Sequence, residues 1–169
     1  AICGKVIQNN SISYDHRRKV KRGLVRIKQI PFKRKNYNKD EFDIDLFTYV
    51  GTIMNGNKLR QVGNVNKNLF IYYDDTDHSW RLKQIGRIVC IPRIEIIHDI
   101  NDYLVNREFN WKNYYAYRNK LYFIKNNFGL RYVIFEKVLI YLRIIKNHNR
   151  ECTKLILQAI RDFNNNKFG

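Results

Sequence analysis

The pattern of apolar residues changes near residue 110, and this change constrains the fold more than any other feature of the sequence. Before it, short runs rich in β-branched residues, such as 1–7 and 88–91, are typical of strands. After it, apolar residues recur at helical spacing over three segments, 111–127, 130–147 and 150–163. We therefore expect an α/β protein, with a mixed sheet and helices in residues 1–110 and a helical extension, 111–169, packed on it.

Turn and helix-end signals divide residues 42–99 into alternating strands and helices. The expected strands are a run that continues through Val50 and the segments 69–73, 88–91 and 94–98. The expected helices are a short one around Lys58 to Gln61, which ends at Gly63, and one that begins at Asp74 or Asp75 and ends at Gly86. Residues 8–41 are polar and basic, and we expect them to form a surface excursion with an edge strand at 24–30.

The net charge limits the partners of the chain. Its 169 residues include 32 basic and 15 acidic side chains, which give a net charge of +17. Such a surface attracts nucleic acids, anionic lipid headgroups or phosphorylated substrates, and charge alone does not choose among them. A nucleic-acid-binding module is therefore an alternative function, although the basic residues are dispersed over every segment and form no recognised binding motif.

The cysteines and the apolar segments indicate the compartment. Cys3, Cys90 and Cys152 are odd in number and form no CxxC pair, which favours buried thiols in a reducing compartment over a disulfide framework or a zinc site. No uninterrupted apolar segment is long enough to cross a bilayer. We expect a cytoplasmic protein that makes peripheral contact with the inner face of the cell membrane.

Three acids gather between residues 74 and 77 of this basic chain: Asp74, Asp75 and Asp77. Acids at a helix start often serve only to cap the helix and to stabilise its dipole. These acids, however, follow an apolar-aromatic run, and α/β folds open their ligand crevices beyond the carboxyl ends of strands. A carboxylate at that place can take a proton from a sugar hydroxyl.

A longer pattern surrounds the acids. It consists of "YVGTIMNG", "FIYYDDTDHSWRL" and "IIHD" within residues 49–99, then "YYAYRNKLYFIKNN" at 114–127 and "AIRDFNNNKFG" at the end. This pattern resembles the second half of the catalytic domain of inverting family 2 glycosyltransferases, which have the GT-A fold. The subgroup it resembles most is the bacterial galactofuranosyltransferase-like and rhamnosyltransferase-like enzymes that build surface polysaccharides.

The resemblance implies roles for seven residues. By position, Asp75 matches the catalytic base and His98 the metal-binding histidine. Five further residues match the substrate site: Gly51, Thr52, Asp74, Asp77 and Arg118. An arginine that ties a helix to the sheet is an equally good interpretation of Arg118.

The resemblance also implies the substrates and the cofactor of the reaction. The donor would be a nucleotide-diphosphate sugar carrying a hexose such as galactofuranose or rhamnose, and the acceptor a glycan or a lipid-linked glycan. A divalent cation, Mn²⁺ or Mg²⁺, would be the cofactor, because it offsets charge on the leaving diphosphate.

One departure from the family pattern sets the scope of these expectations. The family's Asp-x-Asp motif and its nucleotide-binding half precede the region that matches here, and the acids at 43–45 and 75–77 have that spacing in the wrong place. We therefore expect a fragment of a transferase, and an inactive remnant is a further alternative. For the aromatic and basic helices between Trp111 and Asn147, packing on the sheet and binding to a membrane interface are both open.

Overall fold

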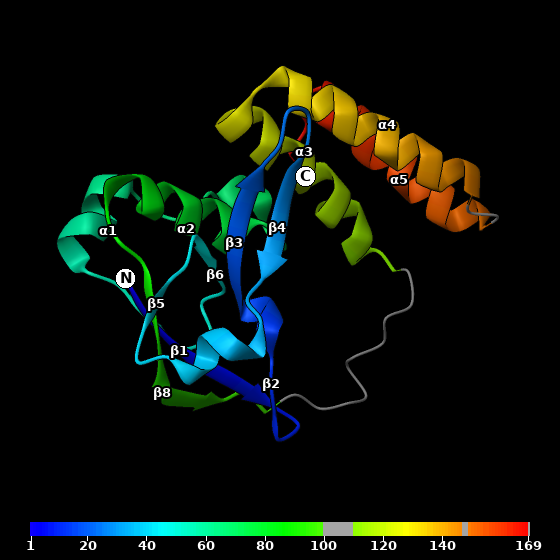
Figure 1. The fold of residues 1–169 in the computed structure, drawn as a ribbon. Coiled ribbons are helices and arrows are strands. Elements are labelled where there is room, and N and C mark those ends of the chain that lie inside the picture. The colour runs from blue at the N-terminus through cyan, green and yellow to red at the C-terminus, as the bar shows by residue number, and fades with distance from the viewer. Residues whose placement is uncertain (100–109, 147–148, 169) are drawn as a thin grey trace. The chain divides into compact units, whose positions relative to one another are not determined.

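The computed structural model describes residues 1–99, 110–146 and 149–168. The chain is mixed α/β: a mixed sheet with one parallel strand pair, a small antiparallel sheet, and three helices in its C-terminal part (Figure 1). The segment between the sheets and these helices, where we expect the boundary between the two parts, lies outside the described residues from 100 to 109.

The chain divides into two compact units. The first comprises residues 1–21, 29–65 and 75–106, and the second comprises 22–28, 66–74 and 107–169. Two short segments, 22–28 and 66–74, therefore belong to the second unit although the segments on either side of them belong to the first.

Eight strands form the two sheets. They are β1 (Ile2–Gln8), β2 (Ser11–Ile12), β3 (Arg17–Arg22), β4 (Ile27–Pro31), β5 (Phe42–Asp43), β6 (Leu46–Phe47), β7 (Thr52–Ile53) and β8 (Val89–Ile97). The larger sheet has the order β2-β1-β8-β5, with β7 also paired to β1, and the smaller sheet has the order β4-β3-β6. The pair β1 and β8 is parallel, and the described partners β2, β7 and β5 are antiparallel to their neighbours.

The parallel pair is interrupted where the sequence places a proline. Cys3 and Gly4 pair with Cys90 and Ile91, but the next residue of β1, Lys5, pairs with Glu95. Three residues of β8, including Pro92, are thus left out of the ladder, which suits a residue without an amide hydrogen. The main chain comes so close here that a Cβ on Gly4 would lie 2.7 Å from the carbonyl oxygen of Ile94. The expected break between 88–91 and 94–98 is therefore a bulge within one strand.

The helices agree with the expectations from their end signals. They are α1 (Gly56–Val62), α2 (Asp74–Ile85), α3 (Lys112–Phe128), α4 (Leu130–Lys146) and α5 (Arg150–Asn164), and three short 3₁₀ segments lie at Tyr14–His16, Arg34–Asn38 and Lys67–Leu69. Gly63 and Gly129 end α1 and α3 as expected, both with positive φ. Among the described residues, no helix is long and apolar enough to cross a membrane.

Two strand predictions are wrong. Residues 69–73 form no strand: Phe70, Tyr72 and Tyr73 have φ of 51°, 62° and 66°, which a β-strand does not allow. The single strand expected to run through Val50 is instead three strands of two residues each, β5, β6 and β7. Both errors have one cause: a short apolar run does not by itself distinguish a strand from a loop whose main chain bonds to side chains.

Each unit has its own apolar core. In the first unit the buried cluster consists of Cys3, Tyr37, Phe42, Ile44, Phe47, Leu82, Ile88 and Cys90. In the second, α3 and α5 pack through buried residues that include Leu121, Phe123, Ile156, Ile160 and Phe163. The three cysteines are buried thiols, as the sequence predicts.

Candidate functional site

Asp74, Asp75 and Asp77 lie in the first turn of helix α2. Asp74 is its first residue and Asp75 its second, and both are half-buried. Carboxylates in a first turn interact favourably with the helix dipole, so the capping interpretation fits their position as well. The hydroxyl of Thr76 donates to Asp75 Oδ1 at 3.2 Å and accepts from Arg18 Nη2 at 3.2 Å. The Thr76 hydroxyl thus connects the guanidinium of Arg18 to the Asp75 carboxylate.

Asp77 is engaged in an ion pair within helix α2. Its Oδ2 lies 2.9 Å from Arg81 Nε, one helical turn on, and the residue is only 7% exposed. The same guanidinium donates to the carbonyl oxygens of Val62, the last residue of α1, and of Asn64, which follows the helix. Asp77 therefore holds an arginine that ties α2 to the end of α1, and this contact accounts for the acid without a substrate.

Helix α3 stabilises the loop 69–73, which precedes the acids, through hydrogen bonds to its main chain. Asn119, which is fully buried, directs Nδ2 at the carbonyl oxygens of Leu69, Ile71 and Tyr72, at 2.6, 3.0 and 2.9 Å. These bonds pair main-chain groups that a strand would have paired with a neighbouring strand. The loop with its three positive φ angles therefore depends on one amide, 47 to 50 residues away in the sequence.

Arg118 has the same kind of role. It is fully buried, donates to the carbonyl oxygen of Asn68 at 3.1 Å, and its guanidinium lies 5.0 to 5.7 Å from the ring centroids of Tyr114, Tyr115 and Phe168. Stacked rings and a carbonyl oxygen satisfy a buried guanidinium without a carboxylate partner. The structure thus offers a structural explanation for Arg118, although the arginine ties its helix to a loop and not to the sheet.

Gly51 and Thr52 lie beside an apolar cavity of about 230 Å³, which Tyr49 also lines. Gly51 has a φ of 62°, and a Cβ there would collide with the side chain of Ile96. Thr52 donates its hydroxyl to the carbonyl oxygen of Thr48 at 2.9 Å. Backbone conformation and a local hydrogen bond thus account for these two residue types.

His98 follows β8 and is fixed by contacts with β1. Its amide donates to the carbonyl oxygen of Ile7 at 2.9 Å, and its Nδ1 lies 2.7 Å from Nε2 of Gln8. The same Gln8 nitrogen lies 3.0 Å from Nε2 of His16, whose Nδ1 bonds to the Thr48 hydroxyl at 2.5 Å. The sequence gives no local signal for Gln8 and His16: the parallel pairing of β1 with β8 brings Gln8 to His98, and His16 comes from the 3₁₀ segment Tyr14–His16.

His16 is the most strongly perturbed histidine of this network. Burial, followed by the positive charge of Arg17 and the proximity of His98, lowers the pKa of His16 from 6.5 to about 4. The ring is therefore neutral at physiological pH and serves as a hydrogen-bonding group.

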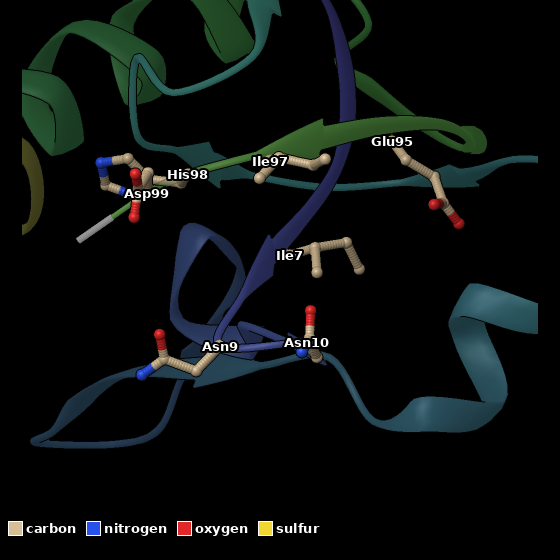
Figure 2. A pocket seen from close by; sticks show the side chains of 7 residues that line it. All are labelled: Ile7, Asn9, Asn10, Glu95, Ile97, His98 and Asp99. Carbon is tan, nitrogen blue, oxygen red and sulfur yellow. The ribbon is translucent and has the colours of Figure 1, made fainter. Parts of the chain in front are cut away.

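A cavity of about 550 Å³ opens beside His98. Its lining consists of Ile7, Asn9, Asn10, Glu95, Ile97, His98 and Asp99. Figure 2 shows His98 and Asp99 at one end, Glu95 at the other end, and the two asparagines opposite β8. The described lining includes none of the acids of α2, so Asp75 and His98 do not share this cavity.

The residues at this cavity fit part of a divalent-cation site. His98 offers an imidazole and Asp99 a carboxylate, whereas Glu95 is already paired with Lys5 at 2.6 Å. Over the described ranges, no three His, Cys, Asp or Glu side chains gather as a metal site would require. Because the Gln8 amide donates to Nδ1, coordination through Nε2 would also need that amide to turn and accept a hydrogen bond from Nδ1.

Comparisons with known proteins identify no family. No protein-family model matches the chain, and no curated protein matches it. A functional proposal therefore depends on the motif pattern around residues 49–127 and on the geometry of the side chains described above.

Proposed function

We propose that the chain is part of an inverting glycosyltransferase that moves a hexose from a nucleotide-diphosphate sugar to a glycan or lipid-linked acceptor. The observation that carries the proposal is the acid cluster at the start of α2. Asp74 and Asp75 lie in the first turn of α2, directly after a loop anchored by Asn119. An inverting transfer needs one such carboxylate on the acceptor side.

Asp75 is the base in this proposal. The acceptor oxygen attacks the anomeric carbon while the bond from that carbon to the diphosphate oxygen breaks, and the bonding electrons leave with the nucleoside diphosphate. The hydroxyl proton passes to the Asp75 carboxylate, so that charge and atoms balance. The hydrogen bond from Thr76 to Asp75 Oδ1 orients the carboxylate during this step.

His98 and Asp99 would hold a divalent cation, Mn²⁺ or Mg²⁺, on the donor side. Such a cation would offset charge on the leaving diphosphate. Gln8 orients the imidazole through Nδ1, and the asparagines across the cavity present amides that suit sugar or ribose hydroxyls. The sugar is galactofuranose or rhamnose in the subgroup that the motifs resemble.

The test is transfer from nucleotide-activated galactofuranose and rhamnose to a lipid-linked acceptor, measured with the longest native form of the protein. Asp75→Asn should lower turnover by about 10²- to 10⁴-fold. It should cost no more than about 1 kcal/mol of stability, because it removes only the interaction of a first-turn carboxylate with the helix dipole. Asp43→Asn, an exposed acid paired with Arg87, is the matched control and should keep its turnover. Turnover close to wild type in Asp75→Asn would rule out the base.

His98→Ala separates the donor side from the acceptor side. It should weaken Mn²⁺ binding, read by calorimetry or by the electron paramagnetic resonance of free Mn²⁺, and leave the fold intact. Unchanged Mn²⁺ binding would remove His98 from the cation site.

Two alternatives give different results in the same preparations. A nucleic-acid-binding module, which the net charge of +17 favours, would shift random oligonucleotides in a salt-dependent manner and bind no nucleotide sugar. An inactive remnant would do neither, while keeping the same fold.

A further inference from the structure

Helix α4 exposes a continuous apolar stripe. Its members are Leu130, Ile134, Val138, Tyr141, Leu142 and Ile145, exposed by 65, 64, 49, 45, 50 and 74%. At about 100° per residue they fall within a sector of about 120° and extend along roughly 22 Å of the helix. The buried residues of α4, which include Tyr132, Val133 and Ile140, lie on the opposite side.

This stripe is larger than the isolated apolar side chains that are common on protein surfaces. Single exposed leucines are normal, but six large apolar side chains in one contiguous row along a helix indicate a surface that is covered in use. A helix that packs on one side and remains apolar on the other has two apolar faces, of which the described part of the chain covers one.

The charges beside the stripe indicate what covers it. The only acid in α4 is Glu136, which is 2% exposed and paired with Lys120 at 2.5 Å. Arg131, Arg143 and Lys146 are exposed cations on the same helix. At about 100° per residue, Arg131 and Lys146 lie within or next to the stripe, whereas Arg143 lies on the side of the buried residues. A second copy of the chain would bring another net charge of +17 to this surface, whereas an anionic bilayer supplies the opposite charge.

We propose that α4 lies in the interface of an anionic membrane, with this stripe in the boundary of the acyl chains and its cations among the headgroups. Basic residues beside an apolar face are typical of helices that lie in the plane of the interface. The inference does not depend on the transferase proposal, because vesicle binding is measured without any nucleotide sugar.

The experiment is flotation of the chain with vesicles of phosphatidylcholine containing 30% phosphatidylserine, and with phosphatidylcholine alone. Ile134→Ser/Ile145→Ser should weaken binding to the anionic vesicles at least ~10-fold, because two large apolar groups no longer enter the interface. Leu24→Ser/Leu157→Ser is the matched control, since it removes two exposed leucines outside the stripe and should bind like the wild type. Arg131→Gln/Lys146→Gln should weaken binding to anionic vesicles only, and less so at high salt.

A fluorescence measurement gives a second test that does not depend on the folding of the double variants. Trp emission of Tyr141→Trp should shift to the blue on addition of anionic vesicles, and that of Leu24→Trp should not. Equal vesicle binding by the stripe double variant and its control would overturn the proposal. So would a concentration-dependent dimer that the stripe variant abolishes while vesicle binding is unchanged, because the stripe would then join two copies of the chain.

Discussion

Replacing Asn119 tests whether one amide maintains the loop that leads to the acids. Asn119→Leu keeps the branching at Cγ, with a larger side chain, but removes the Nδ2 group that lies 2.6 Å from the Leu69 carbonyl oxygen and 2.9 to 3.0 Å from those of Tyr72 and Ile71. A buried acceptor left without a partner costs about 1 to 3 kcal/mol. The Leu69 carbonyl bears this cost in full, and the other two bear less because water reaches them in part. We expect the free energy of unfolding to fall by about 2–4 kcal/mol.

Urea unfolding followed by circular dichroism measures this loss, and hydrogen exchange of the amides from 70 to 75 localises it. Asn127→Leu is the matched control on the same helix: Asn127 is half-buried and donates only within α3, to the Phe123 carbonyl oxygen at 2.9 Å. It should cost less than about 1 kcal/mol. A change below about 0.5 kcal/mol in Asn119→Leu, with unchanged exchange of the loop amides, would refute the reasoning.

Three further predictions concern buried titratable groups in the first unit. The pKa of His16 is about 4 in the folded state against 6.5 unfolded, so the unfolded chain binds the extra proton between these values; stability should fall by up to about 3 kcal/mol from pH 7 to pH 4, and His16→Gln should flatten this dependence in denaturation experiments. Arg17→Lys should cost about 3–5 kcal/mol in urea unfolding, because Arg17 donates to five carbonyl oxygens in a geometry that an ammonium cannot reproduce. Burial raises the pKa of the Cys90 thiol to about 11, so a thiol reagent should label it only after denaturation, and rapid labelling of the native protein would contradict its burial.

The helices were predictable because their signals are local. Gly63 and Gly129 lie at the ends of α1 and α3, and apolar spacing indicates α3, α4 and α5 without any knowledge of tertiary contacts. The first strand also follows from a short stretch of sequence, and Pro92 marks where the ladder is interrupted, although the sequence predicted two strands there and the structure has one strand with a bulge.

The loop 69–73 was not predictable in this way. Five apolar and aromatic residues in a row are typical of a buried strand, and the residues that prevent a strand lie in α3. An asparagine within a helix has no local signature that separates an exposed amide from one that bonds to a loop. The contact between Asn119 and the loop spans 47 to 50 residues, beyond the range of any periodicity.

The candidate site also combines residues that the sequence could identify with contacts that it could not. The acids and His98 could be picked out by type and position, but their partners could not. Gln8 reaches His98 because β1 pairs in parallel with β8, with Ile7 opposite Ile97, and His16 reaches Gln8 from a separate segment before β3. The separation of Asp75 from the cavity at His98 is likewise a tertiary property, because it depends on which elements line that cavity.

Two fully buried arginines, Arg17 and Arg118, supply main-chain hydrogen bonds where regular secondary structure is short or absent. Arg17 donates to the carbonyl oxygens of Gly4, His16, Thr48, Val50 and Gly51, and thereby satisfies main-chain groups around β6 and β7 that such short ladders leave without partners. Arg118 and Asn119 do the same for the loop before α2. A guanidinium can bind several carbonyl oxygens at once because its five N–H groups lie in one plane. Part of the positive charge of this chain is therefore interior and structural, and only the remainder is available to attract a membrane or a diphosphate.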